Sequence, residues 1–221
     1  MLVPDQASTK VVLYLHPRGK SAQAGIGGEM ETLMKQGCTV IAPDLIGLPG
    51  EIGPGVVAKP EEGAPRLWYG YVLLGKSMVG RQMADVMRVV RFAQARFRVA
   101  PNELLGFARG ECGPMLLHTA AIEGVFGKIA LVEAPLSYRS LVMSPNYAPN
   151  YLTAAVPGAL TAYDLPDLVA CLAPRAVLFA DPRDSLAAPA AVAVVAQEMA
   201  IATRAFASHP ARLSVVLSAD D

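Results

Sequence analysis

The sequence predicts an α/β fold: an open, mostly parallel sheet of about six strands with helices on both faces. Short runs of Val, Leu and Ile alternate with amphipathic segments along the 221 residues. Each connection between two apolar runs is long enough for a crossover between parallel strands. The chain is 53% hydrophobic and 17% charged, with a mean hydropathy of +0.36. This composition is typical of strands that are buried on both faces of a sheet.

Six short apolar runs are the expected strands, and most of them end at polar or turn-forming residues. They cover 11–16, 39–43, 104–108, 128–132, 176–180 and 213–217. Because an open parallel sheet binds its ligands at the carboxyl ends of the strands, the residues there are candidate site residues. They are His16, Asp44, Arg109, Gly110, Glu133, Asp181 and Asp184.

The longest expected helix is Val79–Arg98. Met83, Val86 and Val90 recur there at helical spacing, and Ser77 is placed to cap its amino end. Shorter helices are expected at 28–36, 67–74, 114–121, 168–172 and 189–207.

Two segments have no helical or strand period. One is a loop at 45–65, rich in Gly and Pro, and the other is an insert at 135–167, rich in Tyr, Pro and Ser. Either Asp164 or Asp167 is expected to cap the helix after the insert, and Pro189 to lie in the first turn of the last helix.

Length and composition limit the classes of partner and site that are expected. A chain of this length fits one domain, 1–221. A net charge of zero gives no reason to expect nucleic acid or an anionic membrane as a partner.

Cys38, Cys112 and Cys171 lack the spacing of metal ligands and are expected to be free, mostly buried thiols. We expect no metal and no cofactor. The first residues do not form a signal peptide, so a cytoplasmic location is expected if the chain is complete.

The segment Pro101–Ala121 reads as a strand, a tight turn at Arg109–Gly113 and an apolar helix. Such a turn presents the nucleophile of α/β-hydrolases, in the motif G-x-S-x-G. The matching window here is Ala-Arg-Gly-Glu-Cys, residues 108–112, so Gly110 stands where the serine is expected. Glycine has no side chain with which to attack an ester. The fold signal is therefore strong, whereas the signal for this chemistry is weak.

Several longer stretches resemble bacterial acetyl-xylan-esterase-type α/β-hydrolases. The stretches are LYLHPRGK, GGEMETLMKQGCTVIAPDLIGLPGEIG, LLGKSMVGRQMADVMRVVRFAQAR, SYRSLVMSPNY and VPGALTAYDLPDLVACLAPRAVLFADPRD, and together they cover most of 11–217. The sequence is most similar to a degenerate branch of that group. In that branch an extra hydrolase-like domain lies beside an active one in a long carbohydrate esterase.

The resemblance implies positions for the catalytic groups. The nucleophile falls on Gly110 and the acid on Asp184, while the histidine would follow Asp221, where this chain ends. The oxyanion loop would be His16–Lys20, with a backbone N–H near Pro17, Arg18 and Gly19 and another from Glu111. On this reading two of the three triad members are missing.

Other residues are possible replacements. Cys112 would be the nucleophile of a shifted elbow, as in dienelactone-hydrolase-like enzymes, or else a packed thiol in the helix. His16 lies at the correct sheet edge for a base or a pocket residue, whereas His118 is expected in the core and His209 at the opposite edge. Asp184 alternatively caps the helix region at Pro189. His16, Asp44, Asp181 and Asp184 could converge on a metal, but no ligand-pair motif supports this.

Two hypotheses follow. In the first, the domain has a decayed Ser-His-Asp triad and a structural or carbohydrate-binding role beside an active esterase domain or a second protomer. In the second, it is an active carboxylic-ester hydrolase that uses Cys112 on small esters. The insert tyrosines either stack on sugars or fill space above the sheet; they are Tyr138, Tyr147, Tyr151 and Tyr163.

Overall fold

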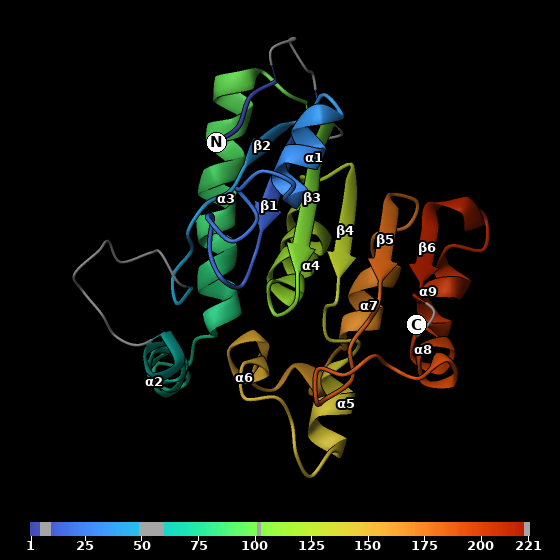
Figure 1. Cartoon of the computed structure of the whole chain (residues 1–221). Coiled ribbons are helices and arrows are strands. Elements are labelled where there is room, and N and C mark those ends of the chain that lie inside the picture. Colours follow the sequence, from blue (N-terminus) through green and yellow to red (C-terminus); the bar gives the residue numbers. More distant parts are fainter. Residues whose placement is uncertain (5–9, 49–59, 101–102, 219–221) are drawn as a thin grey trace.

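A computed structural model describes residues 1–4, 10–48, 60–100 and 103–218, with the backbone alone for residues 60–64. One six-stranded sheet, all parallel in its named strands, has the order β2-β1-β3-β4-β5-β6 (Figure 1). The strands are β1 Val11–Leu15, β2 Thr39–Ile41, β3 Leu104–Arg109, β4 Lys128–Val132, β5 Ala176–Ala180 and β6 Leu213–Val216. The six predicted strands and the parallel α/β sheet are confirmed.

The strand order places a switch point between β1 and β3. From β1 the chain adds β2 on one side, with Val11 opposite Thr39, and later adds β3 on the other side, with Val11 opposite Leu104. The connections that leave β1 and β3 therefore diverge at the carboxyl edge. Such a divergence opens a crevice where ligands of open α/β sheets bind.

Helices cover the two faces of the sheet unequally. The larger core joins Val11, Leu13 and Leu15 of β1 to one set of helices. These helices are α3 Met78–Phe97, α4 Cys112–Glu123, α7 Leu165–Ala170, α8 Val192–Glu198 and α9 Ala200–Ala205. On the opposite face, Tyr14 packs with Met30 of α1, which spans Glu29–Lys35. Helices thus lie on both faces, as predicted.

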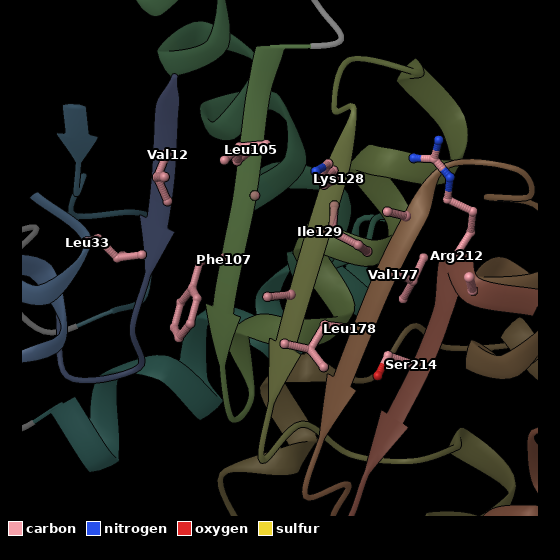
Figure 2. Close-up of a pocket in the computed structure, with 14 residues that line it drawn as sticks. Val12, Leu33, Leu105, Phe107, Lys128, Ile129, Val177, Leu178, Arg212 and Ser214 are labelled. Carbon is pink, nitrogen blue, oxygen red and sulfur yellow. The ribbon is translucent and has the colours of Figure 1, made fainter. Parts of the chain in front are cut away.

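The second face is covered only in part by the described residues. β1 and β2 are buried along their whole length. In β3, β4 and β5, buried residues alternate with partly or fully exposed ones, and in β6 partly buried residues alternate with exposed ones. Leu178 of β5, for example, is 38% exposed, and it projects from this open face in Figure 2. The expectation that all strands are buried on both faces is therefore wrong for these four strands.

Two helix starts follow from their capping residues. Ser77 caps α3, its hydroxyl accepting a hydrogen bond from the N–H of Gly80. Asp164 and Asp167 both take part in a capping box at the start of α7, which begins at Leu165, three residues earlier than expected. The two alternative caps are thus two halves of one motif.

Other boundaries differ from the prediction. The helix α2 spans Pro60–Leu73 and continues through Pro65, so the expected loop at 45–65 ends sooner; residues 49–59 lie outside the described residues. Proline fixes φ near its helical value, but it is also common in turns. The sequence therefore did not distinguish a loop from a helix in this segment. Pro189 forms a bridge to Arg183 instead of starting a helix, and the expected last helix is the pair α8 and α9.

The insert also contains ordered structure. It forms α5 Tyr138–Met143, α6 Tyr151–Ala154 and the 3-10 turn η2 Ala159–Thr161, and a second 3-10 turn, η3 Pro210–Arg212, precedes β6. Within the described ranges, no helix combines the length and hydropathy of a membrane span.

Candidate functional site

The turn between β3 and α4 has the predicted strand–turn–helix geometry. Gly110 follows the last residue of β3 with a φ of +54°, and α4 begins two residues later at Cys112. The Gly110 N–H donates to the carbonyl of Val132 at 2.9 Å, and the Gly113 N–H donates to the carbonyl of Gly110 at 2.9 Å. A Cβ on Gly110 would meet only Pro17 Cγ, at 3.6 Å. The turn therefore has room for a side chain that this sequence does not supply.

The same backbone turn recurs at the next two strand ends. Glu133 after β4 and Asp181 after β5 have φ values of +53° and +49°. Their N–H groups donate to the last carbonyl of the neighbouring strand, Ala180 at 2.9 Å and Val216 at 2.8 Å. A non-glycine residue in this region costs about 1 kcal/mol. These turns place acidic side chains along the carboxyl edge.

A polar cavity of about 560 Å³ opens at this edge, beside the switch point. Its walls come from the loop after β1, the β3–α4 turn, the ends of β4 and β5, and the start of α6. The candidate residues His16, Pro17, Arg18, Gly110 and Glu111 all line it. The structure therefore brings the predicted nucleophile position and most of the predicted oxyanion loop to one cavity.

A chain of ion pairs crosses the cavity wall. Arg109 pairs with both Glu29 and Glu133, and Glu133 accepts a second hydrogen bond from Arg183 at 2.6 Å. Tyr14 donates its hydroxyl proton to Glu29. Burial opposes the charge on Arg109, but its glutamate partners outweigh burial and raise its pKa. Burial likewise opposes the charge on Glu133, but Arg183 and Arg109 lower its pKa.

His16 is buried and engaged within its own turn. Its Nδ1 accepts a hydrogen bond from the Arg18 N–H at 3.0 Å, and its carbonyl accepts one from the Gly19 N–H at 2.9 Å. Burial, followed by the charges of Arg18 and Arg109, lowers the pKa of His16. The loop was expected to supply one oxyanion-hole N–H, near Pro17, Arg18 and Gly19. Pro17 has no N–H, and the N–H groups of Arg18 and Gly19 are both used inside the turn.

Cys112 lies in the hydrophobic core, at the start of α4. Its side chain is fully buried, and burial, together with the charge of Glu111, raises the pKa of the thiol well above its ordinary value. A nucleophilic cysteine needs a lowered pKa. Burial also raises the pKa of Glu111 itself. Cys38 is also buried and Cys171 is exposed, so the three thiols are free and mostly buried, as expected.

Asp184 closes a turn. Its carboxylate accepts hydrogen bonds from the N–H groups of Leu186 at 2.8 Å and Ala188 at 3.0 Å. Because α8 begins only at Val192, the alternative that Asp184 caps a helix at Pro189 is wrong. Its role as the triad acid stays a prediction.

The proposed metal ligands have separate partners. Asp44 accepts a hydrogen bond from the Lys20 N–H at 2.9 Å, and Asp181 binds the N–H and hydroxyl of Ser218 at 2.6 and 2.8 Å. Among the described residues, no group of three or more His, Cys, Asp or Glu side chains is placed to hold a metal ion.

His118 bonds to the Pro114 carbonyl at 2.7 Å and to the Tyr163 hydroxyl at 2.8 Å, so it is a core residue as expected. Exposed His209 precedes η3 and β6, at the amino edge. Tyr138 and Tyr151 are buried and fill space above the sheet, and Tyr151 also borders the cavity.

Some cavity residues were not predicted. Arg183 follows β5 in the sequence, and the same strand-end rule that selected Asp184 could have found it. Asn150 lies beside α6, and Glu29 of α1 pairs with the cavity residue Arg109; only the tertiary fold reveals these positions.

No protein-family model matches this sequence, and no curated protein matches it. Solved structures match its fold. A candidate acetyl xylan esterase from Bacteroides fragilis NCTC 9343 has a TM-score of 0.74 at 14% identity, over 98% of this chain and 61% of that one. The chain therefore spans less than two thirds of that protein.

Two further structures agree. An acetyl xylan esterase from Paenibacillus sp. R4 has a TM-score of 0.56 at 16% identity, over 99% of this chain and 72% of that one. A candidate dienelactone hydrolase from Klebsiella pneumoniae subsp. pneumoniae MGH 78578 has a TM-score of 0.60 at 16% identity, over 99% and 78%. The chain thus has an α/β-hydrolase-like fold that is structurally similar to these esterases.

Proposed function

We propose that this chain is an esterase-related domain that binds a carbohydrate in the carboxyl-edge cavity and lacks Ser-His-Asp ester hydrolysis. The observation that carries the proposal is the position of Gly110. It occupies the tip of the β3–α4 turn beside the cavity, where a serine would attack. Removal of a triad nucleophile leaves only residual electrostatic catalysis.

The chemistry of the cavity supports a polyhydroxylated ligand. Arginine and glutamate side chains alternate along its wall, and Gln23 and Asn150 add amide groups that both donate and accept. Sugar hydroxyls can satisfy such mixed donors and acceptors. Two similar structures carry the name acetyl xylan esterase, which favours xylan-derived oligosaccharides as first ligands to test. An active esterase domain or a second protomer would supply hydrolysis in this scheme.

The binding test uses isothermal titration of acetylated and deacetylated xylo-oligosaccharides. Arg18→Gln is the site variant, because Arg18 lines the cavity and its removal orphans no carboxylate in the described ion pairs. Loss of one charged hydrogen bond weakens binding by roughly tenfold. Arg91→Gln is the matched control, because Arg91 is an exposed arginine on α3. Absence of binding to the wild-type protein would refute the carbohydrate proposal.

The alternative function is an active carboxylic-ester hydrolase in which Cys112 attacks small esters. Its position as the first residue of α4, two residues after Gly110, favours this alternative, whereas its burial and raised pKa count against it. Hydrolysis of p-nitrophenyl acetate by the wild-type protein and by Cys112→Ala separates the two. Turnover that the substitution abolishes establishes the alternative, and turnover equal to buffer eliminates it.

A further inference from the structure

The loop after β1 carries two cationic side chains, and only one of them has a carboxylate partner. Lys20 pairs with Asp44. Arg18 belongs to no ion pair among the described residues, and its guanidinium donates no hydrogen bond to them. Arg18 is exposed and lines the carboxyl-edge cavity. Its guanidinium therefore offers five N–H donors to an acceptor that enters the cavity.

The backbone at Arg18 is held in place by its own turn. The Arg18 N–H donates to His16 Nδ1 at 3.0 Å, and the Gly19 N–H donates to the His16 carbonyl at 2.9 Å. His16 is buried directly after β1. A ligand therefore has to order the side chain of Arg18 but not the loop, which lowers the entropic cost of binding.

The other cations of the cavity belong to a chain of ion pairs that is neutral as a whole. Arg109 pairs with Glu29 and Glu133, and Glu133 also pairs with Arg183. Two positive charges thus face two negative charges. Arg18 lies outside this chain and adds one uncompensated positive charge to the described cavity wall.

Glu111 is the remaining charged residue of the described cavity lining. Burial raises its pKa, although a backbone hydrogen bond and one from Asn150 favour the carboxylate. A raised pKa favours the neutral carboxyl group, so Glu111 opposes a bound anion less than an ordinary glutamate does. The described lining therefore favours a ligand with a single negative charge.

We infer that the saccharide bound in this cavity carries a carboxylate, as a uronic acid does, and that Arg18 binds this carboxylate. The inference rests on the proposed function and adds a preference among saccharides to it. A planar guanidinium matches a planar carboxylate through two parallel hydrogen bonds. The amide groups of Gln23 and Asn150 remain for the sugar hydroxyls. A phosphate monoester, with a charge of about −2, matches the single uncompensated charge less well.

The test compares two ligands that differ only at the carboxylate. One is xylotriose with a glucuronic acid branch, and the other is the same tetrasaccharide with that carboxylate reduced to a hydroxymethyl group. Isothermal titration of the whole chain at low salt should give about tenfold tighter binding of the acid. The preference should shrink at about 1 M salt, which screens exposed charges.

The outcomes separate this inference from the proposed function. Binding of both ligands with equal affinity overturns the inference and leaves the carbohydrate proposal standing. Absence of binding of either ligand refutes both. A preference for the acid that salt does not reduce also overturns the inference, because it would not depend on the charge of Arg18.

Variants assign the preference to Arg18. Arg18→Gln should bring the ratio of the two affinities close to one, because glutamine has no charge. Arg18→Lys should keep part of the ratio, because lysine retains the charge but not the planar fork. Arg91→Gln, which removes an exposed arginine of α3, should leave the ratio unchanged. Circular dichroism checks that each variant is folded. An unchanged ratio in Arg18→Gln, or an equal loss in Arg91→Gln, overturns the inference.

A phosphorylated sugar is the competing ligand, because arginine also binds phosphate. Glucuronate and glucose 6-phosphate are compared as displacers of the acidic tetrasaccharide. Displacement at a lower concentration of glucuronate than of glucose 6-phosphate agrees with the inference. Displacement at an equal or lower concentration of glucose 6-phosphate overturns it.

Discussion

Gly113 and Ala134 approach so closely that a Cβ on Gly113 would overlap the Cβ of Ala134. This contact joins the first turn of α4 to the segment after β4. Gly113→Ala should therefore destabilise the protein by about 1–3 kcal/mol through overpacking. Urea unfolding at neutral pH measures the change.

Gly70→Ala is the control for that experiment. Gly70 lies in α2, and a Cβ added to it would have nothing within 4 Å, so alanine should stabilise the helix by up to about 1 kcal/mol. A Gly113→Ala variant as stable as the wild-type protein would show that α4 shifts freely against β4.

Gly110→Ser should fold and still not become an esterase. The side chain has space, and the left-handed φ of +54° costs about 1 kcal/mol. In neutral His16, acceptance at Nδ1 leaves the proton on Nε2, so neither ring nitrogen is ready to take the serine proton. p-Nitrophenyl acetate turnover should stay at the wild-type level. Stoichiometric labelling of the introduced serine by a fluorophosphonate would disprove this expectation.

The three thiols should differ in reactivity. Under native conditions a disulfide reagent should modify only exposed Cys171, because Cys38 and Cys112 are buried and burial raises the pKa of Cys112. Cys171→Ser should react at none of its thiols until urea is added. Fast native modification of Cys112, mapped by mass spectrometry, would instead favour the cysteine esterase.

Acid should weaken the ion-pair chain. The pKa of Glu133 is lowered in the folded protein, so its contribution to stability is present above the ordinary glutamate value of about 4.5 and is lost as the pH falls through the lowered value. Glu133→Gln should reduce the loss of stability between about pH 5 and 3, measured by urea midpoints. Glu123→Gln, an exposed change on α4, should keep the wild-type slope.

The burial of His16 and His118 predicts that stability also depends on pH in a higher range than that of Glu133. Burial lowers the pKa of His118 and of His16 in the folded protein. The unfolded chain therefore binds more protons below its histidine pKa of about 6.5, and stability falls as the pH drops from there. His118→Gln should remove part of this dependence, whereas His209→Gln at an exposed position should not. An unchanged slope in His118→Gln would contradict the assignment.

Much of the fold could be predicted because strands such as VVLYL and KIALV are short, apolar and separated by long connections. The β3–α4 turn could be predicted from its glycines. The open face could not, because Leu105, Ala130 and Leu178 are apolar although they lie on the uncovered side. Nor could the contact between Arg109 and Glu29, which lie far apart in sequence and meet only when α1 folds over β1.

The strand order also affects how the chain is assembled during translation. β1 can pair with β2 soon after both leave the ribosome, but its other neighbour, β3, begins only at Leu104. Long-range parallel pairing is slow to form and leaves strand edges open to aggregation in the meantime. Nascent chains that end before Leu104 should therefore depend on chaperones, and those that extend through β3 should be the first to resist proteolysis.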